Sequence, residues 1–366
     1  MSDVASSHQS LGHAWLSEAI RRGASDVHLV AGHRPTLRLH GRLTELDEPV
    51  LTGEVARDTL LPLCPSRVLN QIDAQKNADF AVELQLEGQT QRCRVNLFQH
   101  GPHLGGCIRI IQSDIPDFSW AGFPSELADR LAHLRDGLVL VSGVTGAGKT
   151  TTLAMLINLL NQEGSCRIIT VEEPIEYVYP RFPTSIVTQR EVGDDVGSFA
   201  DGLKYGLRQD PDVILVGEIR DRDTAQMALS AAETGHLVFS TLHTRDAKGA
   251  ISRFSDLFPQ SSQGEIRAQL AMSLRAVVSQ HLLPSREEGG KRELALEVMI
   301  NNSPISSAIR TGKLESIDMN ILTGRSDGML PLDESVKRLF EDGRISRATA
   351  DRFLTDKRFV NRANAY

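Results

Sequence analysis

The chain has 366 residues, of which 40% are hydrophobic and 24% are charged, and its formal net charge is −7. This composition is typical of a soluble globular protein with about two domains. The acidic balance argues against a broadly basic surface, so we expect no nucleic acid among the partners. The 4 cysteines form no C-x-x-C pair, which argues against a disulfide framework or a structural zinc site and favours reduced thiols in a cytoplasmic protein.

No apolar run in the sequence approaches the length that is needed to cross a bilayer. The polar residues 1–10 also lack the apolar segment of a secretory signal. We interpret these ten residues as a disordered tail. Any association with a membrane is therefore expected to come through partner proteins.

Residues 11–113 predict a mixed α/β domain with a largely antiparallel sheet. An amphipathic helix over 11–22 opens it, because Leu11, Trp15 and Ala19 fall on one face at helical spacing. Alternating apolar and polar runs, punctuated by turn residues, then predict strands. The further elements expected are a helix over 53–61 and strands over 79–86, 92–98 and 106–111.

The segment 114–124 is rich in proline and glycine and is interpreted as a linker. Residues 125–300 alternate short apolar runs with helical stretches, which predicts a parallel sheet covered by helices. Residues 301–366 are predicted to form a mostly helical C-terminal region. The strands expected in the central part lie over 138–142, 167–171, 213–216 and 237–241, and the C-terminal helices over 304–311, 332–341 and 346–355.

The sequence Gly143-Val-Thr-Gly-Ala-Gly-Lys-Thr150 matches G-x-x-x-x-G-K-[ST] at every fixed position, between an apolar run and a helical stretch. Glycines allow the backbone to approach an anion, and the freed N–H groups and the helix N-terminus point at the β-phosphate. We expect Lys149 to reach the β- and γ-phosphates of ATP and the Thr150 hydroxyl to ligate Mg²⁺. The residues expected to contact the nucleotide are Gly143, Thr145, Gly146, Ala147, Gly148, Lys149, Thr150 and Thr151.

Two strand ends carry acidic side chains. Glu218 follows the run 213–216, and the carboxyl edge of an open α/β sheet is where ligands bind, so Glu218 can hold Mg²⁺ directly or through water. The alternative is that Glu218 caps a helix that begins near Arg220. At the end of another strand, the paired acids Glu172 and Glu173 need a cation or a raised pKa. We expect Glu172 to be the base that orients water, and the alternative is a solvated acidic loop.

Two histidines flank the strand expected over 237–241. His243 follows its end, on the edge where the phosphate loop and Glu218 are expected. We expect His243 to contact the γ-phosphate and to report hydrolysis, with a purely structural histidine as the alternative. For His236, which precedes the strand, both interpretations stay open.

These motifs together resemble the PilT family of type IV pilus retraction motors, in the secretion-ATPase superfamily. The resemblance extends from about residue 11 to 355 and is most specific over 208–244. It implies a PAS-like N-terminal domain, a RecA-like ATPase core and a homohexameric ring. It also names residues 170–177 the Asp box, 213–218 the Walker B strand and 232–244 the His box.

The chain departs from the family pattern at two places. Glu173 stands where the family usually has Asp, which keeps the charge but lengthens the reach by one methylene. Retraction motors also carry a C-terminal motif similar to Ala-Ile-Arg-Asn-Leu-Ile-Arg-Glu, and the segment 304–311 keeps only Arg310 of its two arginines. A four-cysteine zinc module, usual in the extension and type II secretion branch, is absent, so the retraction branch fits better.

The resemblance also implies that the N-terminal domain of one subunit covers a nucleotide site, and Arg94 and Arg109 stand at positions where the family has arginines. The alternative is that both are ordinary exposed strand residues. Neutralising the γ-phosphate is a role that arginines often fill. The function expected is a hexameric ATPase that drives type IV pilus retraction and works against a platform protein of the inner membrane. The alternatives are a related ATPase that serves a secretion or DNA-uptake system, and a nucleotide-gated scaffold with little turnover.

Overall fold

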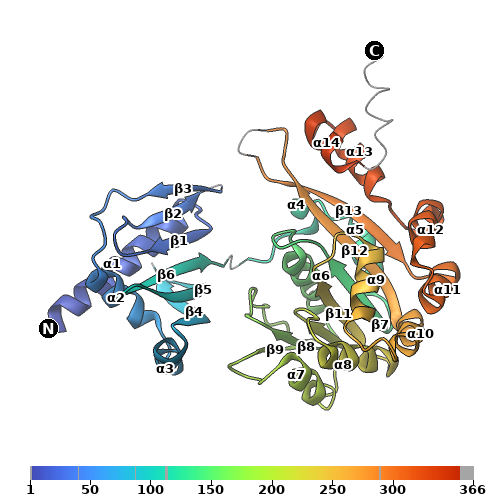
Figure 1. Ribbon diagram of the computed structural model, residues 1–366, viewed down its shortest axis with the longest axis horizontal. Helices are drawn as coiled ribbons and strands as arrows, with labels where there is room; N and C mark the ends of the chain where they lie inside the picture. Colours follow the sequence, from blue (N-terminus) through green and yellow to red (C-terminus); the bar gives the residue numbers. More distant parts are fainter. Residues whose placement is uncertain (1, 40, 87, 112–113, 288–289, 355–366) are drawn as a thin grey trace. The chain divides into compact units, whose positions relative to one another are not determined.

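The computed structural model describes residues 2–39, 41–86, 88–111, 114–287 and 290–354. The chain divides into two compact units, Met1–Asp114 with Pro174–Val178, and Ile115–Glu173 with Tyr179–Tyr366 (Figure 1). Residues 112–113 and 355–366, which fall within two of the expected domains, lie outside the described residues. The domain boundaries expected from the sequence stay a prediction.

The N-terminal unit is built on an antiparallel sheet with the strand order β3-β2-β1-β6-β5-β4. Helices α1, α2 and α3 pack with the sheet around one core, which includes Leu16 of α1, Val68 of α3 and Val95 of β5. The elements are α1 Ser2–Arg21, β1 Asp26–Leu29, β2 Thr36–Leu39, β3 Arg42–Glu45, α2 Gly53–Leu60, α3 Ser66–Gln75, β4 Asn77–Leu86, β5 Gln89–His100 and β6 His103–Ile110.

Two features of this unit differ from the sequence-based expectation. The first ten residues were expected to be disordered, but α1 begins at Ser2. The reason is that no proline or glycine interrupts residues 2–11, so polar composition alone does not stop the helix. Helix α3 was not expected either.

The four cysteines are free, as expected, and burial raises the pKa of Cys93 to about 12, which makes that thiol unreactive.

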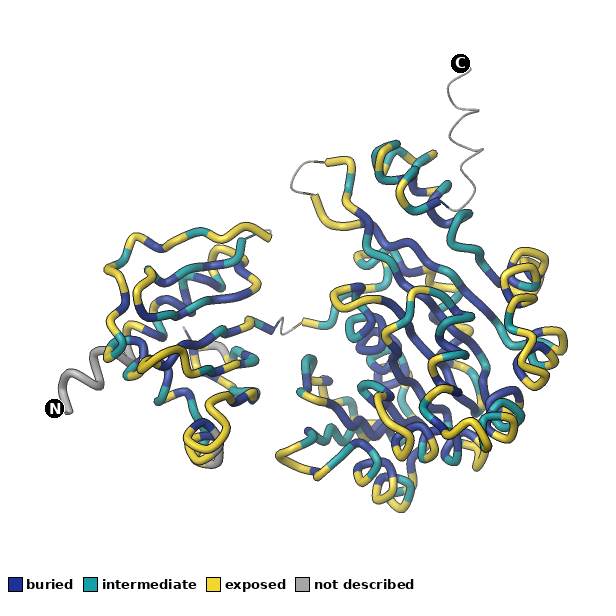
Figure 2. Tube along the Cα trace, viewed as in Figure 1, coloured by how far each residue is buried: buried dark blue, intermediate teal, exposed yellow. Residues whose placement is uncertain are grey.

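The second unit is built on a seven-stranded sheet with the order β13-β12-β7-β11-β10-β8-β9. Its central strands are fully buried, as the dark tube in Figure 2 shows for β7 and β11. Helices α7 to α12 contribute to the large core on the sheet, and α6 packs against β7 and β11. The strands are β7 Gly137–Ser142, β8 Arg167–Glu172, β9 Ile186–Glu191, β10 Val213–Val216, β11 Leu237–Leu242, β12 Leu274–Leu283 and β13 Glu293–Ile300.

The sheet of the second unit was expected to be parallel throughout, but its edge strand β13 is antiparallel. Strand β13 runs antiparallel to β12, with Ala276 opposite Ile300 and Leu283 opposite Glu293. The connection over 284–292 is shorter than the dozen or more residues that a parallel crossover needs, so the two strands form a hairpin. The expected linker also contains a short helix, α4.

The helices of the second unit include the three that were expected near the C-terminus, of which the last ends at Phe353. They are α4 Phe118–Ala121, α5 Ser125–Ala132, α6 Lys149–Glu163, α7 Phe199–Gly206, α8 Arg222–Glu233, α9 Ala247–Asp256, α10 Gln263–Ser273, α11 Ser303–Thr311, α12 Ile317–Thr323, α13 Leu332–Glu341 and α14 Arg347–Phe353. Ser346 caps α14 by accepting a hydrogen bond from the backbone N–H of Thr349, as its position in the sequence predicted.

Candidate nucleotide site

The segment Gly143–Thr150 joins strand β7 to helix α6, which is the strand, loop and helix context that the motif requires. Gly146 and Gly148 have φ angles of 78° and 84°, which favour glycine. At Gly143 (φ 153°) an added Cβ would lie 2.7 Å from the carbonyl oxygen of Gln280 on β12. The loop is thus shaped by glycine both through its backbone angles and through its close approach to the neighbouring strand.

The side chain of Lys149 lies against the loop itself. Its Nζ donates hydrogen bonds to the carbonyl oxygens of Gly143 (2.9 Å) and Val144 (3.3 Å), and the residue is buried. The ammonium group is therefore held by the backbone of the loop. Of the other residues expected to contact the nucleotide, Ala147 is buried, Thr145 is exposed in the loop, and Thr150 and Thr151 lie in the first turn of α6.

The carboxyl ends of four neighbouring strands lie at the same edge of the sheet. Strand β11 pairs in parallel with both β7 and β10, and β10 pairs in parallel with β8. Just past the strand ends, the N–H of Gly143 donates to Leu242 (3.3 Å) and that of Gly217 to Val171 (2.8 Å). The phosphate loop, Glu172, Glu218 and His243 therefore occupy one edge, where ligands bind in open α/β sheets.

Glu218 and His243 contact each other at this edge. One carboxylate oxygen of Glu218 lies 3.2 Å from Nε2 of His243, and the other pairs with the guanidinium of Arg220. Arg220 also reaches Glu173, with 2.8 Å between Nη1 and Oε2. Arg220 thus joins the acids at the ends of β8 and β10. Sequence reasoning considered Arg220 only as the start of a helix, although a basic residue next to an acidic strand end is a usable signal.

Glu172 has different surroundings from Glu173. It is the last residue of β8 and is buried, whereas the side chain of Glu173 is 42% exposed. Oε1 of Glu172 accepts hydrogen bonds from the Thr170 hydroxyl (2.7 Å) and from Nε2 of Gln189 on β9 (3.2 Å). Because a buried carboxylate is costly unless it is hydrogen-bonded, these donors are what allow Glu172 to lie at the sheet edge.

His236 lies at the other end of β11, before its first residue. Its Nδ1 is 3.0 Å from the carbonyl oxygen of Ala231 and 3.2 Å from the Thr234 hydroxyl. These contacts close the turn between α8 and β11. The position at the amino end of a parallel strand separates His236 from the edge that carries His243.

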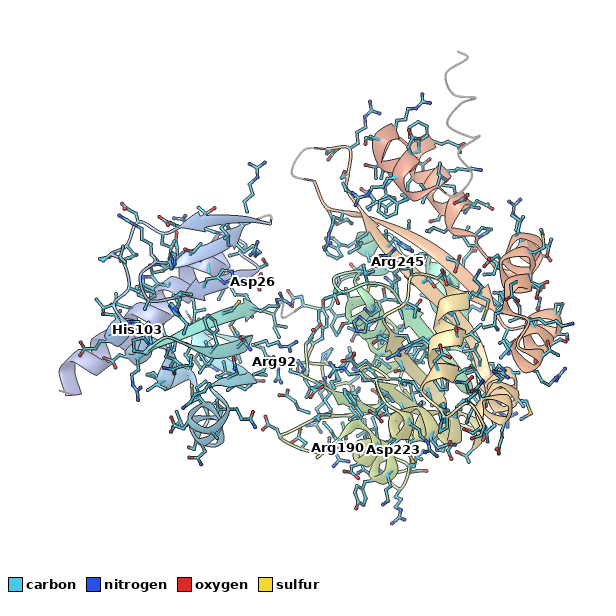
Figure 3. All side chains as sticks on the ribbon, viewed as in Figure 1. Asp26, Arg92, His103, Arg190, Asp223 and Arg245 are labelled. Atoms are coloured by element: carbon cyan, nitrogen blue, oxygen red, sulfur yellow. The ribbon has the colours of Figure 1, made fainter. Side chains whose placement is uncertain are left out.

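Arg94 and Arg109 belong to the N-terminal unit. They face each other across β5 and β6, where they are register partners. Arg94 pairs with Asp79 (2.7 Å), and Arg109 pairs with Asp26 (2.9 Å). Figure 3 labels Asp26 on the sheet of this unit. Their contribution to a nucleotide site stays a prediction.

The chain matches the model of the family described as "Type II/IV secretion system protein" over residues 2–320. The chain belongs to this family. Among relatives of the type II/IV secretion system protein family, it is 38% identical to the "Type IV pilus retractation ATPase PilT" of Pseudomonas aeruginosa, covering 92% of this chain and 95% of the relative. It is 37% identical to a "Twitching motility protein" of Neisseria gonorrhoeae, covering 87% and 83%.

A solved structure titled "Crystal Structure of the Pilus Retraction Motor PilT and Bound ADP" superposes with a TM-score of 0.84 at 39% identity. It covers 95% of this chain and 98% of the other. The resemblance to PilT-like members of the type II/IV secretion system protein family, the P-loop fold and the assignment as an ATPase are confirmed. In the described part of the chain, no helix is both long and apolar enough to span a bilayer.

Proposed function

We propose that this chain is a motor ATPase that hydrolyses ATP to retract type IV pili. The observation that carries the proposal is the gathering of the phosphate loop, Glu172, Glu218 and His243 at one edge of a parallel sheet. The retraction role rests on the similarity to the pilus retraction ATPase of P. aeruginosa, which extends over nearly the whole of both chains.

In the proposed site, the loop N–H groups and the Lys149 ammonium bind the β- and γ-phosphates. Glu172 accepts the proton of the water that attacks the γ-phosphorus, and the bond between that phosphorus and the leaving ADP oxygen breaks. His243 contacts the γ-phosphate while Glu218 fixes the imidazole through the 3.2 Å contact at Nε2. Loss of the phosphate would then change the surroundings of His243, which begins the loop to α9.

Magnesium fits the oxygen donors at this edge, because a hydroxyl and a single carboxylate beside phosphates are typical ligands of this ion. Thr150 and Glu218 would hold it, either directly or through water. Magnesium would supply neutralisation of the phosphate charge. The structure adds one condition. Both oxygens of Glu218 already have protein partners, so Arg220 or His243 has to share or release the carboxylate when the ion binds.

We further propose a cytoplasmic homohexamer in which Arg94 and Arg109 of one subunit approach the nucleotide of its neighbour, with a platform protein of the inner membrane as partner. The two residues are cross-strand neighbours, so both side chains leave the same face of the sheet. Each is held by an acid, Asp79 or Asp26, which would have to release it.

The deciding experiment compares purified wild-type protein with Lys149→Met for phosphate release, and a strain lacking the gene with its complemented parent for pilus-dependent surface motility. We expect hydrolysis to require Lys149 and motility to require the gene. Hydrolysis without a motility defect would favour the secretion or DNA-uptake alternative, which the altered segment around Arg310 keeps open. Binding of ATP without turnover would favour the scaffold.

A further inference from the structure

Strand β9 contributes one side chain to the proposed catalytic centre. Gln189 is the parallel register partner of Thr170, so its side chain lies on the same face of the sheet as those of Thr170 and Glu172. Its Nε2 donates to Oε1 of Glu172 at 3.2 Å, the same oxygen that accepts the Thr170 hydroxyl at 2.7 Å. Two donors from adjacent strands thus fix one oxygen of the carboxylate, and thereby the direction of the other.

The orientation of the Gln189 amide is set by a second contact. Its Oε1 accepts a hydrogen bond from the backbone N–H of Tyr179 at 3.0 Å. A carbonyl oxygen can accept from a backbone N–H but an amide NH₂ cannot, so the NH₂ group has to face Glu172. Tyr179 lies in the segment that connects β8 to β9 and begins after Glu172. The Gln189 side chain therefore joins this connecting segment to the carboxylate that precedes it.

We propose that Gln189 is a positioning residue for ATP hydrolysis, which holds the carboxylate of Glu172 in the direction that a water-activating base requires. This inference rests on the proposed role of Glu172. A base has to lie within hydrogen-bond reach of the proton that it takes, and a small misplacement lowers the rate of the chemical step more than it weakens binding. Gln189 acts through Glu172 and does not itself contact the substrate.

A purely structural role would be different, because Gln189 would then serve only to hold the Tyr179 loop. Two substitutions separate the roles. Gln189→Glu keeps an acceptor for the Tyr179 N–H but replaces the donor that faces Glu172 with a second carboxylate. Gln189→Met keeps the length of the side chain and removes both hydrogen-bonding groups. The matched control is Gln85→Glu on the exposed end of β4, in the other unit.

The experiment measures kcat and KM for ATP hydrolysis by the full chain, together with the affinity for a fluorescent ATP analogue and the thermal melting of each variant. We expect both Gln189 variants to lower kcat by about tenfold to a hundredfold, with an analogue affinity within about twofold of wild type. Gln85→Glu should leave all three quantities unchanged. We expect Thr170→Val combined with Gln189→Met to cost less than the product of the single effects, because both donors hold the same oxygen.

The inference is overturned if Gln189→Glu has the kcat of the wild type, since the contact with the Tyr179 N–H alone would then be enough for hydrolysis. It is also overturned if the variants raise KM and leave kcat unchanged. Should Gln189→Met melt early, Gln189→Glu decides alone, because it preserves the contact to the loop. Glu172→Gln distinguishes this failure from a failure of the proposed function: if that variant hydrolyses normally, Glu172 is not the base.

Discussion

Replacing Glu172 with Gln tests the proposed chemistry with little disturbance of the structure. The amide keeps an Oε1 that can still accept from Thr170 and Gln189. A hydrogen bond to a charged group contributes about 1.5–3 kcal/mol, against about 0.5–1.5 for a neutral one, so two weakened bonds cost about 2 kcal/mol. Burying a neutral amide in place of a charge offsets part of this cost. The fold should therefore persist.

The expected loss of activity is larger than the loss of stability. A positioned general base contributes about a hundredfold to ten-thousandfold in rate, or about 3–5 kcal/mol of barrier. We expect Glu172→Gln to bind ATP normally and to hydrolyse it at least a hundredfold more slowly. Phosphate release and binding of a fluorescent analogue measure the two effects, with Glu233→Gln at an exposed helix end as the control. Hydrolysis within about twofold of wild type would refute the reasoning.

Three further outcomes are expected. Lys149→Met should lower the rate of ATP hydrolysis on the order of a thousandfold, because it removes the ammonium group that lies at the phosphate loop. Unchanged phosphate release would contradict this. Burial raises the pKa of Glu297 to about 7, with Asp246 and Asp318 adding to the shift while the Ala247 N–H and Lys248 oppose it. The folded state then holds this proton more tightly than the unfolded chain does. The protonated Glu297 therefore contributes up to about 3 kcal/mol to the free energy of unfolding, and this contribution is lost as the pH rises from about 4.5 through 7. Glu297→Gln should flatten that part of the melting temperature against pH, and an unaltered slope would contradict the assignment. Arg109→Ala should leave ATP binding intact and lower turnover of the assembled protein, which steady-state kinetics on the purified oligomer can decide.

The parts of the molecule that depend on local sequence were predictable. The loop Gly143–Thr150 fixes its own backbone through its glycines, and its flanking runs identify β7 and α6. The carboxyl ends of parallel strands share an edge, so placing Glu172, Glu218 and His243 together required only the assignment of their strands. This is why the proposed site could be inferred without knowledge of the pairing order.

The parts that depend on distant contacts were not predictable. The apolar run of β12 does not reveal that this strand pairs in parallel with β7, which lies much earlier in the sequence. Strand β9 has a mixed sequence with partly exposed side chains, so neither its position beside β8 nor the contact of Gln189 with Glu172 follows from periodicity. The ion pairs of Arg94 and Arg109 depend on the register of the N-terminal sheet.

The extra methylene at position 173, compared with aspartate, allows the Glu173 carboxylate to reach Arg220. An aspartate there would withdraw the carboxylate by about one carbon–carbon bond, about 1.5 Å, and the 2.8 Å contact would open beyond hydrogen-bond range. Because both side chains are largely in solvent, little free energy would change. The location of the guanidinium would change instead, because Arg220 would be held by Glu218 alone and would move with that carboxylate.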